Sequence, residues 1–97
     1  FMRLLGLCMA AGKVVSGEQA VSIALNKGRA ALVVLDAQSA PATQQRAAAM
    51  CSRRGVDLLI VDADVGKMVG HEGRKLAAVT DAGFAKALLS AHGGQMQ

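Results

Sequence analysis

Three short runs of apolar residues, each bounded by polar ones, constrain the fold of this chain more than any other feature. They are ALVVLD at residues 31–36, DLLIVD at 57–62 and LAAVTD at 76–81. None alternates between apolar and polar residues, as a strand with one face in water would. Continuous runs of this length are typical of strands that are covered on both faces. The sequence therefore predicts a buried sheet with other elements packed on each side of it.

Segments with helical periodicity separate these strands. Glycine stands directly after three of them, at Gly12, Gly28 and Gly55, where it suits the left-handed conformation that ends many helices. Helices that alternate with buried strands are typical of the α/β class, so we expect a three-layer α/β/α sandwich. The expected helices cover residues 2–11, 41–54, 64–69 and 83–92, a further one starts at Ser16 or Gly17 and ends before Gly28, and residues 13–15 form a short strand.

The length of 97 residues suits one domain. We expect this single domain to cover residues 1–92 and the last five residues, GGQMQ at 93–97, to form a disordered tail. No apolar run approaches the roughly 18 residues of a membrane span. No charged and then apolar leader opens the sequence. The expected protein is therefore cytoplasmic and has no membrane partner.

The charge balance favours a polyanionic partner. Eleven Lys and Arg residues against seven acids give a net charge of +4, and a basic domain attracts nucleic acid and releases its counterions. A solvated surface that happens to be basic explains the same charge. Two Phe and no Tyr or Trp leave no aromatic platform on which splayed bases stack. The nucleic-acid interpretation therefore narrows to a structured RNA that is contacted through backbone amides and cations.

Enzyme motifs find little support in the sequence. The two histidines, His71 and His92, belong to no recognisable nucleophile motif. The Gly-Lys pair at residues 66–67 lacks the earlier glycine and the following Ser or Thr of a phosphate-binding loop. We therefore expect a protein that is not an enzyme, with no catalytic residue and no cofactor.

Metal sites are equally weak candidates. Cys8 and Cys51 form no CxxC pair and lie among apolar neighbours in predicted helices, so we expect both in the core. Asp62 and Asp64 either share a Mg²⁺ ion or end a strand and cap a helix, and the cap is the commoner arrangement. The sequence therefore predicts no metal site.

Residues 14–28, VVSGEQAVSIALNKG, predict a strand that runs into a helix whose first turn has little to bury. Ile23 falls on the polar side of that helix, between Gln19 and Lys27. An ordinary amphipathic helix explains this pattern, and so does a surface that offers free backbone amides beside Lys13 to an RNA. At about 100° per residue, the polar face consists of Glu18, Gln19, Ser22 and Asn26, and the inward face of Ala20, Val21, Ala24 and Leu25.

Three blocks of the sequence resemble the ribosomal L7Ae/L30e superfamily of kink-turn RNA-binding proteins, and within it the small bacterial YlxQ-like branch. The blocks are LLGLCMAAGKVVSGEQAV, GRAALVVLDAQSAP and VGKMVGHEGRKLAAVTDAGFAKAL, which together span most of the chain. The resemblance implies the α/β/α sandwich of that family, built around a four-stranded mixed sheet. It also implies that the chain binds structured RNA.

The resemblance further indicates which residues contact RNA. In that family the second helix begins Gly-Thr/Ser-Asn-Glu, with Lys three residues later. Gly17 matches the glycine and Gln19 stands at the Asn position, whereas Ala20 and Ile23 replace the Glu and Lys. A second family contact region, a loop, aligns with residues 71–75. The predicted RNA-binding residues are Lys13, Ser16, Gly17, Glu18, Gln19, Lys27, His71, Glu72, Arg74 and Lys75.

Two functions follow from these observations. The first is binding of a structured, kink-turn-like RNA, in a ribosome or another ribonucleoprotein, with kink-turn specificity weakened by Ala20 and Ile23. The alternative is a protein–protein scaffold on the same fold, because some members of that superfamily, such as the Gadd proteins, bind proteins instead. Ile23 on a polar face suits a protein partner or a weak homodimer.

Overall fold

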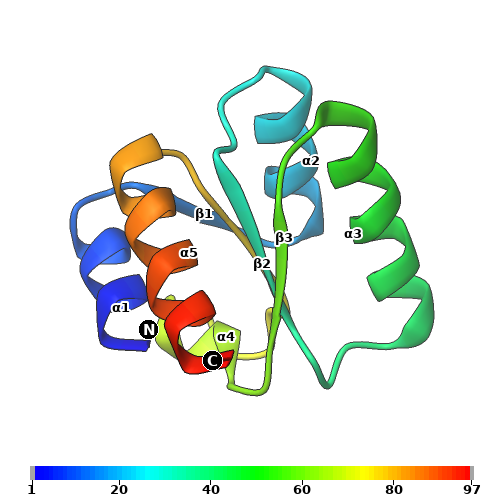
Figure 1. Cartoon of the computed structure of the whole chain (residues 1–97). Coiled ribbons are helices and arrows are strands. Elements are labelled where there is room, and N and C mark those ends of the chain that lie inside the picture. Colours follow the sequence, from blue (N-terminus) through cyan, green and yellow to red (C-terminus); the bar gives the residue numbers. More distant parts are fainter. Residues whose placement is uncertain (1, 97) are drawn as a thin grey trace.

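A four-stranded sheet separates two layers of helices in this structure, a computed structural model that describes the backbone of residues 2–96 and the side chains of residues 3–92 (Figure 1). α1, α4 and α5 lie on one face of the sheet, and α2 and α3 lie on the other. The elements are α1 (Met2–Ala10), β1 (Val14–Ser16), α2 (Glu18–Asn26), β2 (Leu32–Asp36), α3 (Pro41–Arg54), β3 (Leu58–Val61), α4 (Val65–Met68), β4 (Leu76–Val79) and α5 (Ala82–Met96).

The strands lie in the order β1-β4-β2-β3. β2 and β3 pair in parallel, whereas β4 pairs antiparallel with both β1 and β2. The sheet is therefore mixed, as expected. β4 is the last strand in the sequence but lies inside the sheet, where Leu76 pairs with Leu35 and Ala77 pairs with both Val34 and Ser16.

Both faces of the sheet carry a hydrophobic core. All five residues of β2 and all four of β4 are buried, which agrees with their continuous apolar sequences. Leu5, Cys8 and Leu88 pack on one face, and Val21 and Cys51 pack on the other. The predicted three-layer sandwich is confirmed, and so is the burial of both cysteines. None of the helices in the described part of the chain is long and apolar enough to cross a membrane.

The helix ends follow the predicted signals. Pro41 opens α3 after Ala40, and Gly55 ends it in the left-handed conformation with φ 66°. The Asp64 carboxylate accepts a hydrogen bond of 3.0 Å from the Lys67 N–H at the start of α4, so Asp64 is a helix cap as expected. Ser16 belongs to β1 rather than to the following helix, and Gly17 is the residue that precedes α2.

One predicted helix end differs from the structure, and the buried stripe of α1 is a further finding. α5 continues to Met96, so the backbone of residues 93–96 is helical where the sequence predicted a helix end at His92 and a tail over 93–97; Gln97 lies outside the described residues. In α1 the deeply buried side chains are Leu5 and Cys8, while Leu7 is exposed. The sequence of this leucine-rich helix did not indicate which of its stripes faces the sheet.

The contact of α4 with the loop that follows it leaves no room for a side chain at Gly66. A Cβ atom at this position lies 2.6 Å from the carbonyl oxygens of both Arg74 and His71. We expect Gly66→Ala to lower the free energy of unfolding by about 1–3 kcal/mol, because the backbone at residues 71–74 has to move away. Denaturant unfolding measures this change.

Gly6 provides the matched control for this substitution. It lies inside α1, and nothing approaches its Cβ position within 4 Å. Gly6→Ala is therefore expected to stabilise the protein by about 0.5–1 kcal/mol, since alanine restricts the unfolded chain and favours the helix. A stable Gly66→Ala protein would contradict the close contact between α4 and the 71–74 loop.

Candidate functional site

Gly17 forms a sharp corner between β1 and α2. Its φ of 94° and ψ of 150° lie in a region that is essentially reserved for glycine. Its N–H donates to the Leu76 carbonyl oxygen at 2.8 Å, which ties the corner to the start of β4. No side chain caps α2, so the first-turn N–H groups at residues 18–20 point out of the helix end without a side-chain acceptor.

The Arg74 side chain holds this corner from the α4–β4 loop. Its Nη1 donates to the carbonyl oxygen and to the hydroxyl oxygen of Ser16, each at 2.9 Å. The guanidinium lies against Gly17, where a Cβ atom would be 3.5 to 3.6 Å from its Nη1, Cζ and Nε atoms. In the part of the chain that is described, the Nε–H and Nη2–H groups of Arg74 have no protein acceptor. One edge of the guanidinium is therefore fixed by the protein and the other remains available.

A shallow open depression joins these groups. It collects four of the predicted RNA-binding residues and adds Arg74 from the second predicted region, together with Ala20 and Ile23. The positive end of the α2 dipole and the Arg74 cation both favour an anion here. The lining residues are Ser16, Gly17, Glu18, Gln19, Ala20, Ile23 and Arg74; we call this depression the Gly17 corner.

Glu18 brings a carboxylate to the same corner but turns it toward α3. Its two oxygens accept hydrogen bonds from Nε and Nη2 of Arg46, the second at 3.2 Å. The hydrogen bond from Arg46 lowers the pKa of the Glu18 carboxyl, and the positive charge of Arg46 acts in the same direction. No sequence pattern indicated this partner, which lies 28 residues further along the chain.

The other residues of the predicted loop, His71, Glu72 and Lys75, do not line the Gly17 corner and make contacts elsewhere. The His71 N–H and carbonyl oxygen bond to Gly66 and Arg74, respectively, so the backbone of His71 shapes the loop. Glu72 borders a separate depression. The Lys75 ammonium lies 3.7 Å from the buried carboxylate of Asp36. Roles for these side chains in RNA binding stay predictions.

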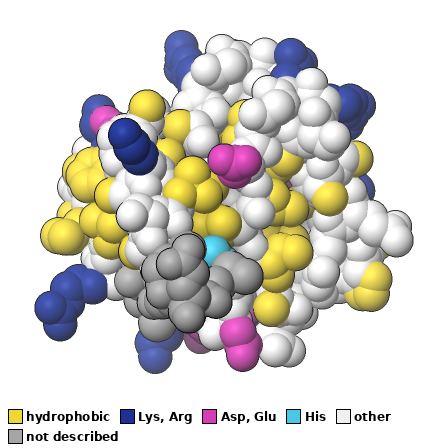
Figure 2. Space-filling model, in the orientation of Figure 1, with side chains coloured by type: hydrophobic (Ala, Val, Ile, Leu, Met, Phe, Trp, Pro, Cys, Tyr) yellow, Lys and Arg dark blue, Asp and Glu magenta, His cyan; other side chains and the backbone are white. Residues whose placement is uncertain are grey.

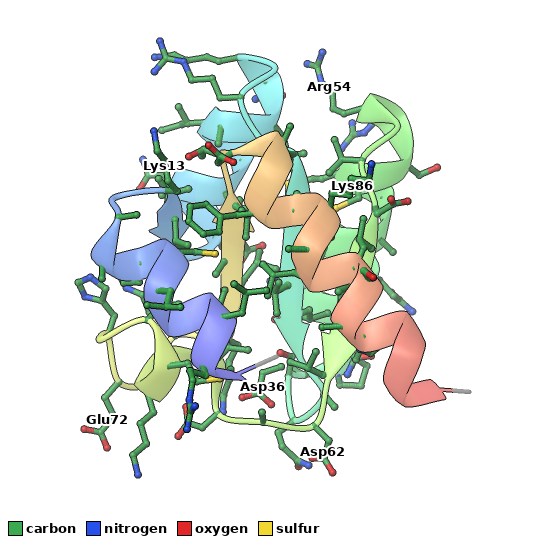
Figure 3. All side chains as sticks on the ribbon, turned by 60° about the vertical axis from the view of Figure 1, so that its left-hand side comes forward. Lys13, Asp36, Arg54, Asp62, Glu72 and Lys86 are labelled. Atoms are coloured by element: carbon green, nitrogen blue, oxygen red, sulfur yellow. The ribbon has the colours of Figure 1, made fainter. Side chains whose placement is uncertain are left out.

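Lys13 and Lys27 lie away from the Gly17 corner. The Lys13 carbonyl oxygen accepts from Thr80 at the end of β4, whereas Gly17 bonds to Leu76 at its start. Figure 3 accordingly places Lys13 and Glu72 toward opposite ends of the molecule. Lys27 follows the C-terminus of α2, about 13 Å along a nine-residue helix. The expectation that Lys13 lies beside the helix N-terminus is therefore wrong, although its role with RNA is untested.

The faces of α2 agree with the expected pattern except at Ala20, which was expected to face inward but is half-buried and lines the Gly17 corner. Val21, Ala24 and Leu25 are buried, while Ile23 keeps 46% of its surface exposed. Ile23 lines the Gly17 corner from the second turn of the helix, a position that its aliphatic character alone did not reveal. An apolar side chain therefore borders an otherwise polar depression.

The described residues offer few side chains for thiol chemistry or metal binding. Burial raises the pKa values of the Cys8 and Cys51 thiols, which keeps them protonated and unreactive. No cluster of three or more His, Cys, Asp or Glu residues suited to a metal ion occurs among the residues that the structure describes. In Figure 2, lysine and arginine side chains project from the rim of the molecule while hydrophobic atoms occupy the middle of this face. The open N-terminus of α2 and the Arg74 cation at the Gly17 corner suit anion binding.

Comparisons with known proteins point to the same family. The sequence profile of the ribosomal protein L7Ae/L30e/S12e/Gadd45 family matches residues 1–89. The RNA-binding protein YlxQ of Bacillus subtilis (strain 168) is 39% identical over 89 residues, which cover 90% of this chain and 89% of that protein.

Two solved structures share the fold. A protein of unknown function from Bacillus halodurans C superimposes with a TM-score of 0.86 at 27% identity, over 92% of both chains. The Giardia lamblia 15.5kD RNA binding protein gives a TM-score of 0.78 at 16% identity, over 94% of this chain and 82% of that one. At this low identity the Giardia protein supports the fold alone.

The Arg46 contact is testable through the pKa of Glu18. We expect Arg46→Gln to raise that pKa toward its ordinary value, because the substitution removes the cation and its hydrogen bonds. A titration of the side-chain carboxyl signal by NMR measures the change. Because the folded-state pKa is lowered, the stabilisation from this pair is present above the unfolded pKa of Glu18 and is lost as pH falls through the folded value.

Arg53→Gln serves as the control, since Arg53 carries the same charge on α3 without an ion pair to Glu18 among the described residues. Its Glu18 pKa should remain low. An equal rise in both variants would attribute the shift to the general charge of α3 rather than to the Arg46 contact.

Proposed function

This chain belongs to the ribosomal protein L7Ae/L30e/S12e/Gadd45 family, and on that premise we propose that it binds structured RNA at the Gly17 corner. The relative in Bacillus subtilis is named as an RNA-binding protein. The net charge of +4 favours the same class of ligand. We place the protein in a ribosome or another ribonucleoprotein of the cytoplasm.

One observation carries this proposal: the fixed orientation of Arg74 beside the open end of α2. Ser16 accepts from Nη1 of Arg74, so the free Nε and Nη2 edge faces the solvent in a defined direction. This edge matches the paired oxygens of a phosphate or the acceptors on a guanine edge. The backbone N–H groups at residues 18–20 offer further donors.

Kink-turn recognition is the finer part of the proposal. Gly17 keeps the family glycine and Gln19 places a longer amide at the family's Asn position. Ala20 and Ile23 lack the groups that the family uses on the sheared G·A pairs and phosphates. A good bidentate base contact contributes about 1–3 kcal/mol of discrimination. We therefore propose that the protein prefers kink-turn RNA with a reduced selectivity.

Restoring the two missing side chains tests this selectivity. We expect Ala20→Glu/Ile23→Lys to raise the preference for a kink-turn RNA, over the same RNA without its G·A pairs, by about tenfold to hundredfold. Gel-shift titrations with both RNAs measure the preference. Ala87→Glu/Ser90→Lys provides the control, because it places the same side chains at the same spacing on an exposed stretch of α5. Equal affinities of the unmodified protein for both RNAs would contradict kink-turn specificity.

Arg74 substitutions test the corner itself. We expect Arg74→Gln to weaken RNA binding roughly tenfold or more, and Arg74→Lys to recover only part of it, because an ammonium lacks the planar fork that bonds Ser16 and a phosphate together. Lys86→Gln on α5, which Figure 3 labels on the opposite helix layer, removes the same charge and should leave the affinity near its original value. Circular dichroism verifies that each variant is folded. Unchanged binding by folded Arg74→Gln would place the RNA elsewhere.

Protein binding is the second candidate function. The exposed Ile23 favours it, because an aliphatic side chain on a polar helix face is a plausible partner contact. If a homodimer forms through this face, sedimentation analysis should give twice the mass of the chain, and Ile23→Ala should restore the monomer.

A further inference from the structure

A second depression lies along the same side of α2, beyond the Gly17 corner. The two share Ala20 and Ile23, so they form one continuous surface. The floor of the second depression is mainly aliphatic, and its far end carries two cations. Its lining residues are Val15, Ala20, Ile23, Ala24, Lys27, Arg29 and Thr80; we call it the α2–β1 groove.

The charges around the α2–β1 groove are of one sign. Lys27 and Arg29 take part in neither of the ion pairs found among the described residues, which join Glu18 to Arg46 and Lys75 to Asp36. No acidic residue lines the groove. The nearest acid in sequence, Asp81 after Thr80, uses its carboxylate to accept from the Phe84 N–H at the start of α5. The groove therefore presents uncompensated positive charge to a ligand.

Lys13 adds a third cation at the same end. Its carbonyl oxygen accepts a hydrogen bond of 2.8 Å from Thr80, a residue that lines the groove. Figure 3 places Lys13 at the same end of the molecule as the turn that follows α2. Lys27 and Arg29 therefore line the far end of the α2–β1 groove, and Lys13 lies close to that end.

The length of α2 allows one strand of nucleic acid to contact both the Gly17 corner and the far end of the groove. Nine residues of α-helix rise about 13 Å. A stacked strand carries a phosphate about every 3.4 Å, so the distance from the Gly17 corner to Lys27 corresponds to about four nucleotides. A strand that starts at the corner reaches the cations at the far end without bending sharply.

We propose that the α2–β1 groove binds a second stretch of the RNA that occupies the Gly17 corner. Lys27 and Arg29 contact its phosphates, and Ile23 supplies an aliphatic surface for a base or ribose between the two charged ends. This inference rests on the proposed function. An RNA fits the groove better than a protein does, because the groove is continuous with the Gly17 corner and its rim carries cations without acids.

The salt dependence of binding separates the two kinds of contact. The probe is the kink-turn RNA, titrated at several salt concentrations. Each lost phosphate contact reduces the slope of log affinity against log salt by about 0.7 to 0.9. We expect Lys27→Gln/Arg29→Gln to weaken binding roughly tenfold and to reduce the slope by about 1.5. Ile23→Ala should weaken binding about threefold to tenfold with an unchanged slope, because it removes an uncharged contact.

Arg3→Gln/Lys86→Gln is the matched control. Both residues are exposed on α1 and α5, in the other helix layer, and their removal lowers the net charge by the same two units. Affinity and slope near those of the unmodified protein are expected for this pair. If this control loses as much RNA affinity as Lys27→Gln/Arg29→Gln, the effect comes from net charge alone, and the proposal that the groove binds RNA is overturned.

The outcomes distinguish this inference from the proposed function. If Arg74→Gln weakens binding while the Ile23 and Lys27/Arg29 variants bind as before, the groove is no RNA site and the Gly17 corner still stands. If the unmodified protein binds neither RNA, the proposed function itself fails. A dimer that Ile23→Ala dissociates, with RNA affinity unchanged, would assign the groove to a second copy of the chain and overturn the inference.

Discussion

The position of β4 between β1 and β2 is the constraint on which the candidate site depends. Because β4 pairs with both neighbours, the loop before it arrives beside the junction of β1 and α2. Gly17 then bonds to Leu76, and Arg74 reaches Ser16 from 58 residues away in the sequence. A glycine corner, an uncapped helix end and a cation meet at one place because one strand enters the middle of the sheet.

Arg74 stabilises this junction, and in the proposed function it also contacts the ligand. Its hydrogen bonds to Ser16 satisfy a strand-end carbonyl and a buried hydroxyl, which stabilises the corner. The same bonds hold the guanidinium in one orientation, so little conformational entropy remains to be lost when a ligand binds. Gly17 makes the corner possible through its φ of 94°, and the guanidinium lies within van der Waals distance of its Cβ position. Structural support and the proposed ligand recognition therefore rest on the same residues.

The net charge of +4 does not show that some surface cations are paired with acids while others are not. Arg46 forms an ion pair with Glu18 and Lys75 forms one with Asp36. The acids partly neutralise the charges of these two cations. Lys27 and Arg29 lie at the rim of an aliphatic groove that no acid lines. A polyanion that approaches the α2–β1 groove therefore meets two cations that no acidic residue in the groove lining offsets.

The sequence by itself determined the α/β class, the buried strands and most helix ends, because these depend on local periodicity and on residues such as Gly55 and Asp64. It also placed Gly17 and Arg74 in candidate regions through family resemblance. Only the tertiary structure decided which candidates meet: Arg74 joins the corner, while Lys13 lies at the far end of β1. The physical reason is that strand order and long-range partners, such as Glu18 with Arg46, are set by packing between segments far apart in the chain.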